Sequence, residues 1–374
     1  MRIAIVDNYY RRFLAQHYAD HPSLASESFE QQKQSLIEAR FGTSDFYSKH
    51  LTDLGCEVVD LIPNCRELQV SWAREHGIWV SPFPVPHRFY RVPVAGNILA
   101  VLPGFLSIAK AQIRALKPDV LFCHDLTFFP AQALRELKQD VRLIVGQIAS
   151  PLPPVSFLSG FDLIFTSFPH FVPRLEALGI ASRYLKLAFE PGIADAFHGV
   201  ERDIPVSFVG GMGHGHRQAI PLLEHLARHT PIRFFGYGAS ELPATSPIRE
   251  KYQGEAWALD MYKVLARSRM TINRHIAVAE NHANNMRMYE ATGMGAMLLT
   301  DQKDDLAEMF EPGREVETYR DRDEAVEKIN ALLSDGARLD SIAAAGHART
   351  LRDHTFKDRM REILAVLNER LRQA

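Results

Sequence analysis

The 374-residue sequence has little cysteine and no excess of charge of either sign. Its three cysteines, Cys56, Cys65 and Cys123, lie far apart and form no CxxC pair. This pattern favours a reducing compartment and argues against a disulfide scaffold and a structural zinc site. Lysine and arginine number 43 against 45 aspartates and glutamates, so the basic excess that supplies most of the affinity of nucleic-acid-binding proteins is missing. We therefore expect a cytoplasmic protein that binds neither nucleic acid nor a metal ion.

Long hydrophobic runs are also missing. One stretch, residues 92–109 between Arg91 and Lys110, carries no charge, but prolines and glycines interrupt it. A helix needs about 20 mainly apolar residues to span a bilayer, so we expect no membrane span. The chain begins with a short apolar strand instead of a secretory signal peptide. Peripheral contact between this stretch and the inner face of the membrane stays open.

What the sequence does contain is a repeated alternation of β-branched runs with helical patterns. In the first half the predicted strands are 2–7, 57–62, 119–124, 141–146 and 162–166, and the predicted helices are 28–40, 44–54, 131–138 and 172–178. After a polar linker at 194–202 the pattern restarts. In the second half the predicted strands are 204–209, 232–235, 270–273 and 296–299, and the predicted helices are 218–229, 259–266, 286–292, 305–310 and 356–371.

Strands that alternate with helices form right-handed βαβ crossovers and a mainly parallel sheet. The sequence therefore predicts an α/β protein of two doubly wound Rossmann-like domains that face a central cleft. The predicted domains are 1–200 and 201–355, followed by a terminal helix at 356–374. Trp72 and Trp257 are expected in the core. In open parallel sheets ligands bind beyond the carboxyl ends of the strands, so the residues that follow each strand are the candidates for a site.

The first such candidate is a glycine cluster between a predicted strand and a predicted helix. Gly210, Gly211 and Gly213 are expected to present free backbone N–H groups at the start of the helix, which suits a phosphate. Arg217 follows and can donate to the same anion. The dinucleotide fingerprint fails because its third position is His216, and no Walker A motif is present, which disfavours a nicotinamide oxidoreductase. A plain tight turn is the alternative.

The second candidate is the predicted helix that begins after Asn285, a plausible N-cap. Arg287 and Glu290 lie three residues apart and therefore share one face of this helix. A carboxylate at this position can accept both hydroxyls of a ribose, while the arginine can meet a phosphate. The alternative is a surface ion pair that contributes little energy.

Four stretches of the second half resemble the GT-B glycosyltransferase superfamily, in particular its spore-maturation-protein-like bacterial branch. They are 206–211 with Arg217, 271–275, 285–301 and 306–313. The resemblance implies a GT-B-like fold in which the C-terminal domain holds a nucleotide diphospho-sugar and the terminal helix crosses back to the N-terminal domain. It also implies a bacterial enzyme of cell-surface polysaccharide or glycan biosynthesis.

The resemblance also assigns roles to residues. Glu290 would hold the ribose, and the other members of the donor pocket would be Gly210, Gly211, Gly213, Arg217, Asn273, His275, Asn285 and Arg287. GT-B enzymes generally need no metal or cofactor, because a helix dipole and cations stabilise the departing diphosphate. Many retaining relatives carry a glutamate where this chain has His282, with Glu280 two residues earlier, so the stereochemistry of transfer stays open.

The N-terminal half is expected to bind the acceptor, a glycan or another hydroxyl compound. Candidates for a general base follow strand ends: Asp7, His124, Asp125, Gln147 and His170. An inverting transfer needs a base within hydrogen-bond reach of the acceptor hydroxyl, whereas a retaining transfer does not. We assign the catalytic role to Asp125 together with the adjacent His124, and a purely structural strand-end histidine is the alternative.

The sequence thus predicts a metal-independent, hexosyltransferase-like glycosyltransferase. Two alternatives share its scaffold: a catalytically silent protein that binds nucleotides or sugars, and a sugar-nucleotide epimerase. A fold by itself does not guarantee activity.

Overall fold

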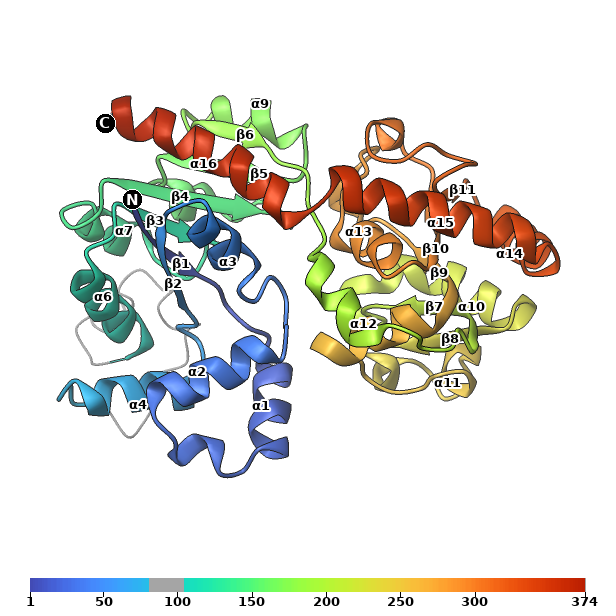
Figure 1. Cartoon of the computed structure of the whole chain (residues 1–374), viewed down its shortest axis with the longest axis horizontal. Coiled ribbons are helices and arrows are strands. Elements are labelled where there is room, and N and C mark those ends of the chain that lie inside the picture. The colour runs from blue at the N-terminus through green and yellow to red at the C-terminus, as the bar shows by residue number, and fades with distance from the viewer. Residues whose placement is uncertain (81–103, 374) are drawn as a thin grey trace. The chain divides into compact units, whose positions relative to one another are not determined.

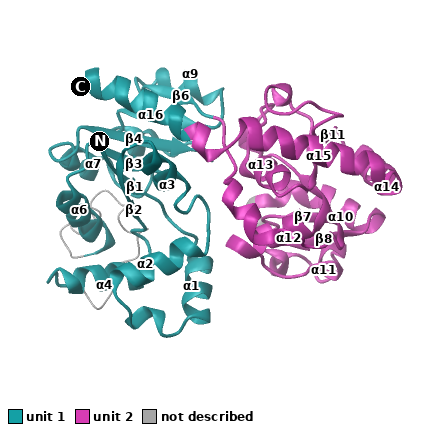
Figure 2. Ribbon diagram, viewed as in Figure 1, with its two compact units in different colours: residues 1–185, 360–374 teal, residues 186–359 magenta. Residues whose placement is uncertain are grey.

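The computed structural model describes residues 1–80 and 104–373. It contains two compact units: unit 1 comprises Met1–Leu185 and Met360–Ala374, and unit 2 comprises Lys186–Arg359 (Figure 2). The polar linker predicted at 194–202 lies inside unit 2. The chain joins this unit earlier, because the Phe189 amide already donates to the carbonyl of His354.

Unit 1 is built on a six-stranded parallel sheet with the strand order β2-β1-β3-β4-β5-β6 (Figure 1). The strands are β1 (Arg2–Val6), β2 (Glu57–Leu61), β3 (Val120–Cys123), β4 (Leu143–Ile148), β5 (Leu163–Thr166) and β6 (Ser182–Tyr184). All but the short β6 were predicted. The four residues of β3 are completely buried, as expected for a central parallel strand that is covered on both faces.

The helices of unit 1 surround this sheet. They are α1 (Arg11–Asp20), α2 (Phe29–Glu38), α3 (Phe46–Asp53), α4 (Arg66–Glu75), α6 (Phe105–Leu116), α7 (Ala131–Leu137), α8 (Val155–Leu158), α9 (Phe171–Glu176) and the part of α16 (Phe356–Gln373) that begins at Met360. Four of these helices were not predicted: α1, α4, α6 and the four-residue α8. Each of these helices begins without a capping side chain, so the usual N-terminal signal is absent.

Unit 2 contains a five-stranded parallel sheet with the order β11-β10-β9-β7-β8 (Figure 1). The strands are β7 (Ile204–Val209), β8 (Ile232–Phe235), β9 (Ser268–Asn273), β10 (Met297–Asp301) and β11 (Glu317–Tyr319). Its core joins Phe234 and Met270 of the sheet to Leu223 and Ile329 of the covering helices. The prediction of two α/β halves with mainly parallel sheets is confirmed.

The helices of unit 2 are α10 (Ile220–His229), α11 (Pro247–Glu250), α12 (Ala258–Arg267), α13 (Met286–Gly293), α14 (Arg322–Ser334) and α15 (Gly336–Asp353). The predicted helix at 305–310 is wrong, because only the 3-10 turn η7 (Leu306–Glu308) forms there. The four-residue α11 was not predicted, and neither were the longer α14 and α15. Both begin at aspartate caps, Asp321 and Asp335, whose side chains accept backbone N–H groups.

Among the described residues, no helix is long and apolar enough to cross a membrane. Most of the uncharged stretch at 92–109 lies outside the described residues, and its end forms the start of α6.

Candidate functional site

The glycine cluster lies at the carboxyl end of β7, but it differs from the expected anion cradle. The Gly210 amide donates to the carbonyl of Phe235, the last residue of β8, at 3.0 Å, and the Met212 amide donates to the carbonyl of Tyr237, two residues later, at 2.8 Å. The α-helix expected directly after the cluster begins only at Ile220, and the 3-10 segment η4 (His214–Ala219) lies between. The prediction of free N–H groups at a helix start is therefore wrong for Gly210.

The glycines instead permit close packing. A Cβ atom on Gly211 would lie 2.4 Å from the His216 ring, and one on Gly213 would lie 2.6 Å from the Glu241 carboxylate. Gly236 has a φ of +118°, and a Cβ there would lie 2.2 Å from the Gly210 carbonyl oxygen. Side chains are thus excluded where the loops after β7 and β8 meet.

Two arginines lie on the segments that surround this turn. Arg217 is exposed on η4, and Arg274 is half-buried directly after β9. Burial lowers the pKa of His216, and the nearby charge of Arg274 lowers it further. Neither arginine forms an ion pair with any residue in the described part of the chain. Arg274 lies in one of the stretches that resemble the GT-B superfamily, 271–275, but it was not predicted as a site residue.

A stacked aromatic pair lies beside the same turn. The rings of Tyr237 and Trp257 are 5.3 Å apart and nearly parallel, at 9°. The Tyr237 hydroxyl is 3.0 Å from His216 Nε2, and Trp257 Nε1 donates to Glu255. Both rings are half-exposed, so the prediction that Trp257 belongs to the core is wrong, whereas Trp72 is buried.

The helix α13 begins as predicted, because Asn285 Oδ1 accepts from the Met288 amide at 3.3 Å. Arg287 Nη1 lies 2.8 Å from Glu290 Oε2, and these side chains are only 17% and 8% exposed. Glu290 also forms a hydrogen bond with the fully buried Tyr262, whose pKa is raised mainly by burial and then by the Glu290 charge. The pair is therefore not the surface ion pair considered as the alternative.

Asn273 and His275 are buried and engaged with neighbouring strands. Asn273 Nδ2 donates to Thr300 on β10, and its Oδ1 accepts from Asn285 at 3.0 Å. His275 Nδ1 lies 2.7 Å from Asp301 Oδ1. Burial tends to raise the pKa of Asp301, but the hydrogen bonds and charge of His275 lower it overall. The Asn273 side chain thus links β9 to β10 and to the N-cap of α13, and the His275 side chain links the end of β9 to the end of β10.

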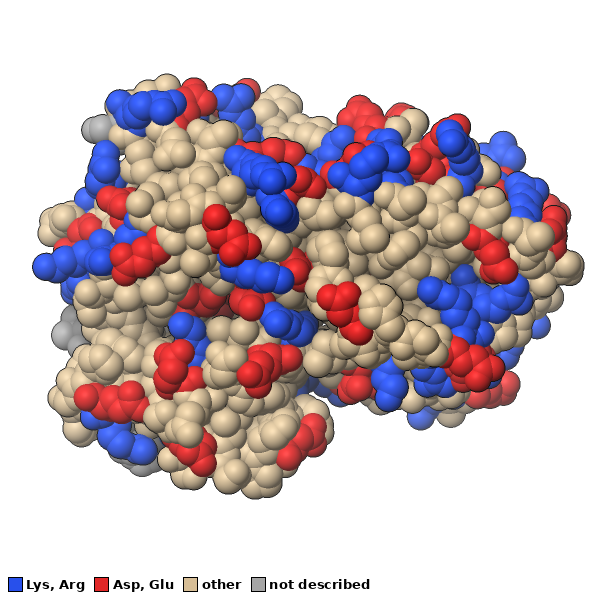
Figure 3. All heavy atoms as spheres, viewed as in Figure 1, with Lys and Arg blue, Asp and Glu red and all other residues tan. Residues whose placement is uncertain are grey.

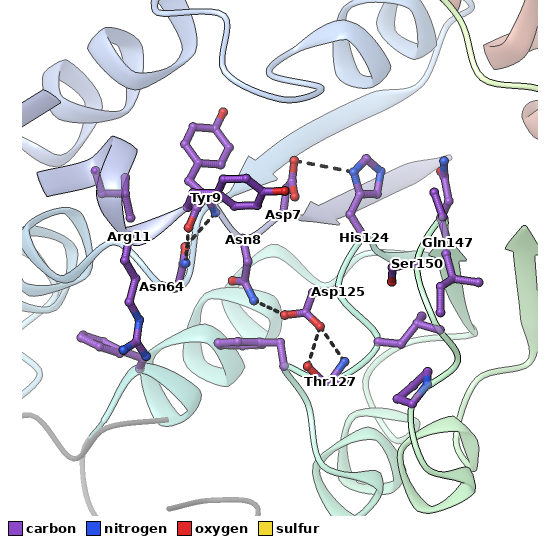
Figure 4. A pocket seen from close by; sticks show the side chains of 18 of the residues that line it. Asp7, Asn8, Tyr9, Arg11, Asn64, His124, Asp125, Thr127, Gln147 and Ser150 are labelled. Carbon is purple, nitrogen blue, oxygen red and sulfur yellow. Dashed lines mark hydrogen bonds and ion pairs between the residues drawn. The ribbon is translucent and has the colours of Figure 1, made fainter. Parts of the chain in front are cut away.

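Unit 1 contains a pocket of about 1020 Å³ at the carboxyl ends of β1, β3 and β4 (Figure 4). Its lining includes four of the five predicted base candidates: Asp7, His124, Asp125 and Gln147. Gln147 accepts a hydrogen bond from the Tyr47 hydroxyl at 2.7 Å. His170, the fifth candidate, is not part of this lining but lies at the start of α9.

Both carboxylate oxygens of Asp125 are engaged. Oδ2 accepts from Asn8 Nδ2 at 2.7 Å, and Oδ1 accepts from the amide and the hydroxyl of Thr127, each at 2.7 Å (Figure 4). This arrangement closes the turn after β3 and ties it to the loop after β1. An acceptor hydroxyl would therefore have to compete with three existing hydrogen bonds.

His124 has a different environment. Its Nδ1 lies 3.6 Å from Asp7 Oδ2, and the Thr43 hydroxyl, which donates to Asp7, is 3.2 Å from the same ring nitrogen. Nε2 is buried without a hydrogen-bond partner, although the side chain is only 10% exposed. A buried polar nitrogen without a partner costs about 1–3 kcal/mol, so this atom is suited to a ligand.

On the face shown in Figure 3, acidic and basic side chains are interspersed, and no large patch of one charge sign is visible. Within residues 1–80 and 104–373, no three histidine, cysteine or acidic side chains come together as a metal site would require.

Comparisons with known proteins agree with this architecture. Residues 217–365, less than half of the chain, match a family model described as glycosyl transferase-like. Sucrose-phosphate synthase from Thermosynechococcus elongatus has a TM-score of 0.61 at 10% identity, with all of both chains covered. Anabaena HepE, solved with UDP and glucose, has a TM-score of 0.60 at 13% identity, with 99% of this chain and 100% of that chain covered.

A glycosyltransferase from Rickettsia africae gives a TM-score of 0.58 at 12% identity, with 100% of this chain and 99% of that chain covered. No curated protein matches the sequence. At such low sequence identity, these similarities show that the folds are alike and show nothing about function. The chain therefore has the fold of the GT-B glycosyltransferases, with two Rossmann-like α/β units and a glycosyl transferase-like segment at residues 217–365.

Proposed function

We propose that the chain is a glycosyltransferase that moves a sugar from a nucleotide diphospho-sugar held by unit 2 to an acceptor hydroxyl. One observation carries the proposal: Arg274, a half-buried cation without an ion-pair partner in the described chain, lies beside a glycine turn and a stacked aromatic pair. The match of residues 217–365 to a glycosyl transferase-like family supports it.

Each part of the donor then has a complementary group on unit 2. Arg274 and Arg217 supply guanidinium groups for the diphosphate, and bidentate N–H donors suit phosphate oxygens. The half-exposed face of the Tyr237–Trp257 pair offers a stacking surface for the nucleobase. Glu290, on α13, is assigned to the ribose hydroxyls, as the family resemblance implies.

The same groups would also assist the chemistry. Negative charge accumulates on the diphosphate as the glycosidic bond breaks, and fixed cations near that charge stabilise the transition state more than the ground state. We therefore propose that Arg274 and Arg217 replace a divalent metal in this role.

The acceptor is assigned to the pocket of unit 1. For an inverting transfer, we propose His124 as the general base, with Asp7 stabilising the imidazolium that forms. This replaces the preference for Asp125, because Asp125 is engaged by three hydrogen bonds while His124 Nε2 has no partner. The proton of the acceptor hydroxyl would pass to Nε2, and the nucleotide diphosphate would leave with the bonding electrons.

Donor cleavage tests the proposal. UDP-glucose is a reasonable first donor for a hexosyltransferase, because the similar fold of HepE was solved with UDP-glucose. The wild-type chain is incubated with UDP-glucose and with a panel of other nucleotide sugars, and the release of nucleotide diphosphate is followed. We expect slow release from at least one donor without acceptor, and loss of at least about tenfold in Arg274→Ala.

Arg322→Ala is the matched control, because Arg322 is an exposed arginine of unit 2 that begins α14. It removes the same charge and is expected to leave donor cleavage unchanged. Binding of nucleotide sugars without any cleavage would favour the silent binding protein instead. Conversion of the donor into another nucleotide sugar would favour the epimerase.

A further inference from the structure

The pocket of unit 1 has two unpaired cations at one side. Arg11 is the first residue of α1 and Arg66 is the first residue of α4, and both line the pocket. Both side chains are exposed, and neither forms an ion pair or hydrogen bond with another residue of the described chain. Arg11 is labelled at the edge of this pocket in Figure 4.

Arg11 has an electrostatically unfavourable position at the start of α1. A helix N-terminus carries a partial positive charge, so a cation in its first turn is repelled and an anion is attracted. The N-cap residue Tyr10 provides no capping hydrogen bond, and the first turn of α1 contains no acid. The first turn of α4 differs, because it contains Glu67 next to Arg66.

Asn64 brings these two helix starts together. Its Nδ2 donates to the Tyr9 carbonyl at 2.7 Å, and its Oδ1 accepts from the Tyr9 amide at 3.1 Å (Figure 4). Since Tyr9 lies just before α1 and Asn64 just before α4, this two-bond clamp fixes the loops that carry Arg11 and Arg66.

An independent observation in the same pocket points to a ligand. The His124 side chain is nine-tenths buried and its Nε2 has no partner, and the Oδ1 atom of Asn8 is likewise buried without a partner. The acids of the lining do not neutralise the arginines. Asp7 and Asp125 accept hydrogen bonds from neighbouring side chains, and Glu67 of the first turn of α4 is the one further acid of the described lining.

We propose that this pocket binds a ligand that carries a phosphate group. Arg11, Arg66 and the first turn of α1 would hold the phosphate, and His124 and Asn8 would contact the polar remainder of the ligand. The identification of this ligand as the acceptor rests on the proposed function, whereas the binding of phosphate in unit 1 does not.

Calorimetric titration of the full chain tests the proposal, with inorganic phosphate and glucose 6-phosphate as the probes and glucose as the uncharged control. We expect saturable binding of at least one phosphate probe and none of glucose. The double variant Arg11→Ala with Arg66→Ala should weaken this binding at least about tenfold. Arg74→Ala, in the last turn of α4 and outside the pocket lining, is the matched control and should bind as the wild type does.

Because unit 2 has its own proposed diphosphate site, Arg274→Ala is titrated in parallel. Phosphate binding that survives Arg274→Ala and is lost in the double variant supports the proposal. Absence of saturable binding, or loss only in Arg274→Ala, overturns it. The double variant Arg11→Lys with Arg66→Lys keeps the charge and should retain part of the affinity, which guards against a folding defect.

Vesicles distinguish the sources of the phosphate. Cosedimentation with vesicles that contain phosphatidic acid, but not with phosphatidylcholine alone, and its loss in the Arg11/Arg66 double alanine variant identify a lipid phosphate. Binding of the soluble probes alone identifies a soluble phosphorylated compound. If no nucleotide sugar is cleaved while phosphate still binds through Arg11 and Arg66, the proposed function fails and the phosphate pocket remains.

Discussion

A substitution of Glu290 can show whether this residue binds the ribose of the donor or has a purely structural role. Its carboxylate forms an ion pair with Arg287 at 2.8 Å and a hydrogen bond with Tyr262, and the side chain is buried. We choose the substitution Glu290→Gln because it preserves shape and removes the charge. If Glu290 holds the ribose, the effect of this substitution on nucleotide binding must depend on the ribose hydroxyls.

Two magnitudes can be estimated: the loss of stability in Glu290→Gln and the loss of affinity when the nucleotide lacks its 2′-hydroxyl. Removing one partner of a buried ion pair leaves an uncompensated charge, so Glu290→Gln should destabilise the fold by about 2 kcal/mol or more through Arg287. A hydrogen bond from a hydroxyl to a carboxylate contributes about 1.5 kcal/mol or more. Loss of the 2′-hydroxyl from the nucleotide should therefore weaken binding to the wild type about tenfold.

The assay is a cycle of two proteins and two ligands. The nucleoside diphosphate that binds the wild type best and its 2′-deoxy analogue are titrated into wild type and Glu290→Gln at a temperature where both are folded. We expect tenfold discrimination in the wild type and less than about threefold in the variant, because the carboxylate that reads the hydroxyl is gone.

Glu317→Gln provides the control. Glu317, on β11, is also a buried acid of unit 2, and it forms an ion pair with Lys328 at 3.0 Å. Its substitution should cost stability but leave the discrimination unchanged. Equal discrimination in the wild type and Glu290→Gln would refute the ribose assignment and leave Glu290 with a structural role only.

Three further predictions concern other positions. Arg217→Ala should weaken binding of a nucleoside diphosphate more than binding of the bare nucleoside by calorimetry, and equal losses would remove its phosphate role. Gly236→Ala should lower the free energy of unfolding by at least about 2 kcal/mol in denaturant titrations, since its left-handed φ and the approach to the Gly210 carbonyl leave no room for a Cβ; an unchanged midpoint would contradict this. Burial lowers the pKa of His354 to about 4, below its unfolded value, so its stabilising contribution is present above about pH 6.5 and is lost as the pH falls towards 4. His354→Gln should reduce this acid-induced loss of stability, and an identical pH profile would show that His354 does not cause it.

The sequence predicts the sheets of this fold better than the helices. Buried parallel strands such as β3 are continuous apolar runs, which are visible without any tertiary information. The helices α1 and α4 have no capping side chain, so their starts are not marked in the sequence. Arg11 and Arg66 line one pocket only because the sheet places the starts of α1 and α4 there, and this placement is not visible in the sequence.

For the candidate site, too, some features could be predicted from the sequence and others depend on tertiary contacts. The rule that ligands lie beyond strand ends directed attention to His124 and Asp125, and both residues line a pocket. It did not distinguish them, because the bonds from Thr127 and Asn8 to Asp125 depend on tertiary structure. Similarly, a single arginine after β9 carries no sequence pattern, so Arg274 became a candidate only through its surroundings.

The central claim is that the carboxyl edge of the sheet in unit 2 holds a nucleotide diphosphate. Hydrogen–deuterium exchange of the full chain, with and without the best-binding nucleoside diphosphate, tests it most directly. The account predicts that protection rises in peptides covering residues 210–219 and 274–290, and that Arg274→Ala removes the effect. Protection confined to other segments, or no change with any nucleoside diphosphate, would contradict it.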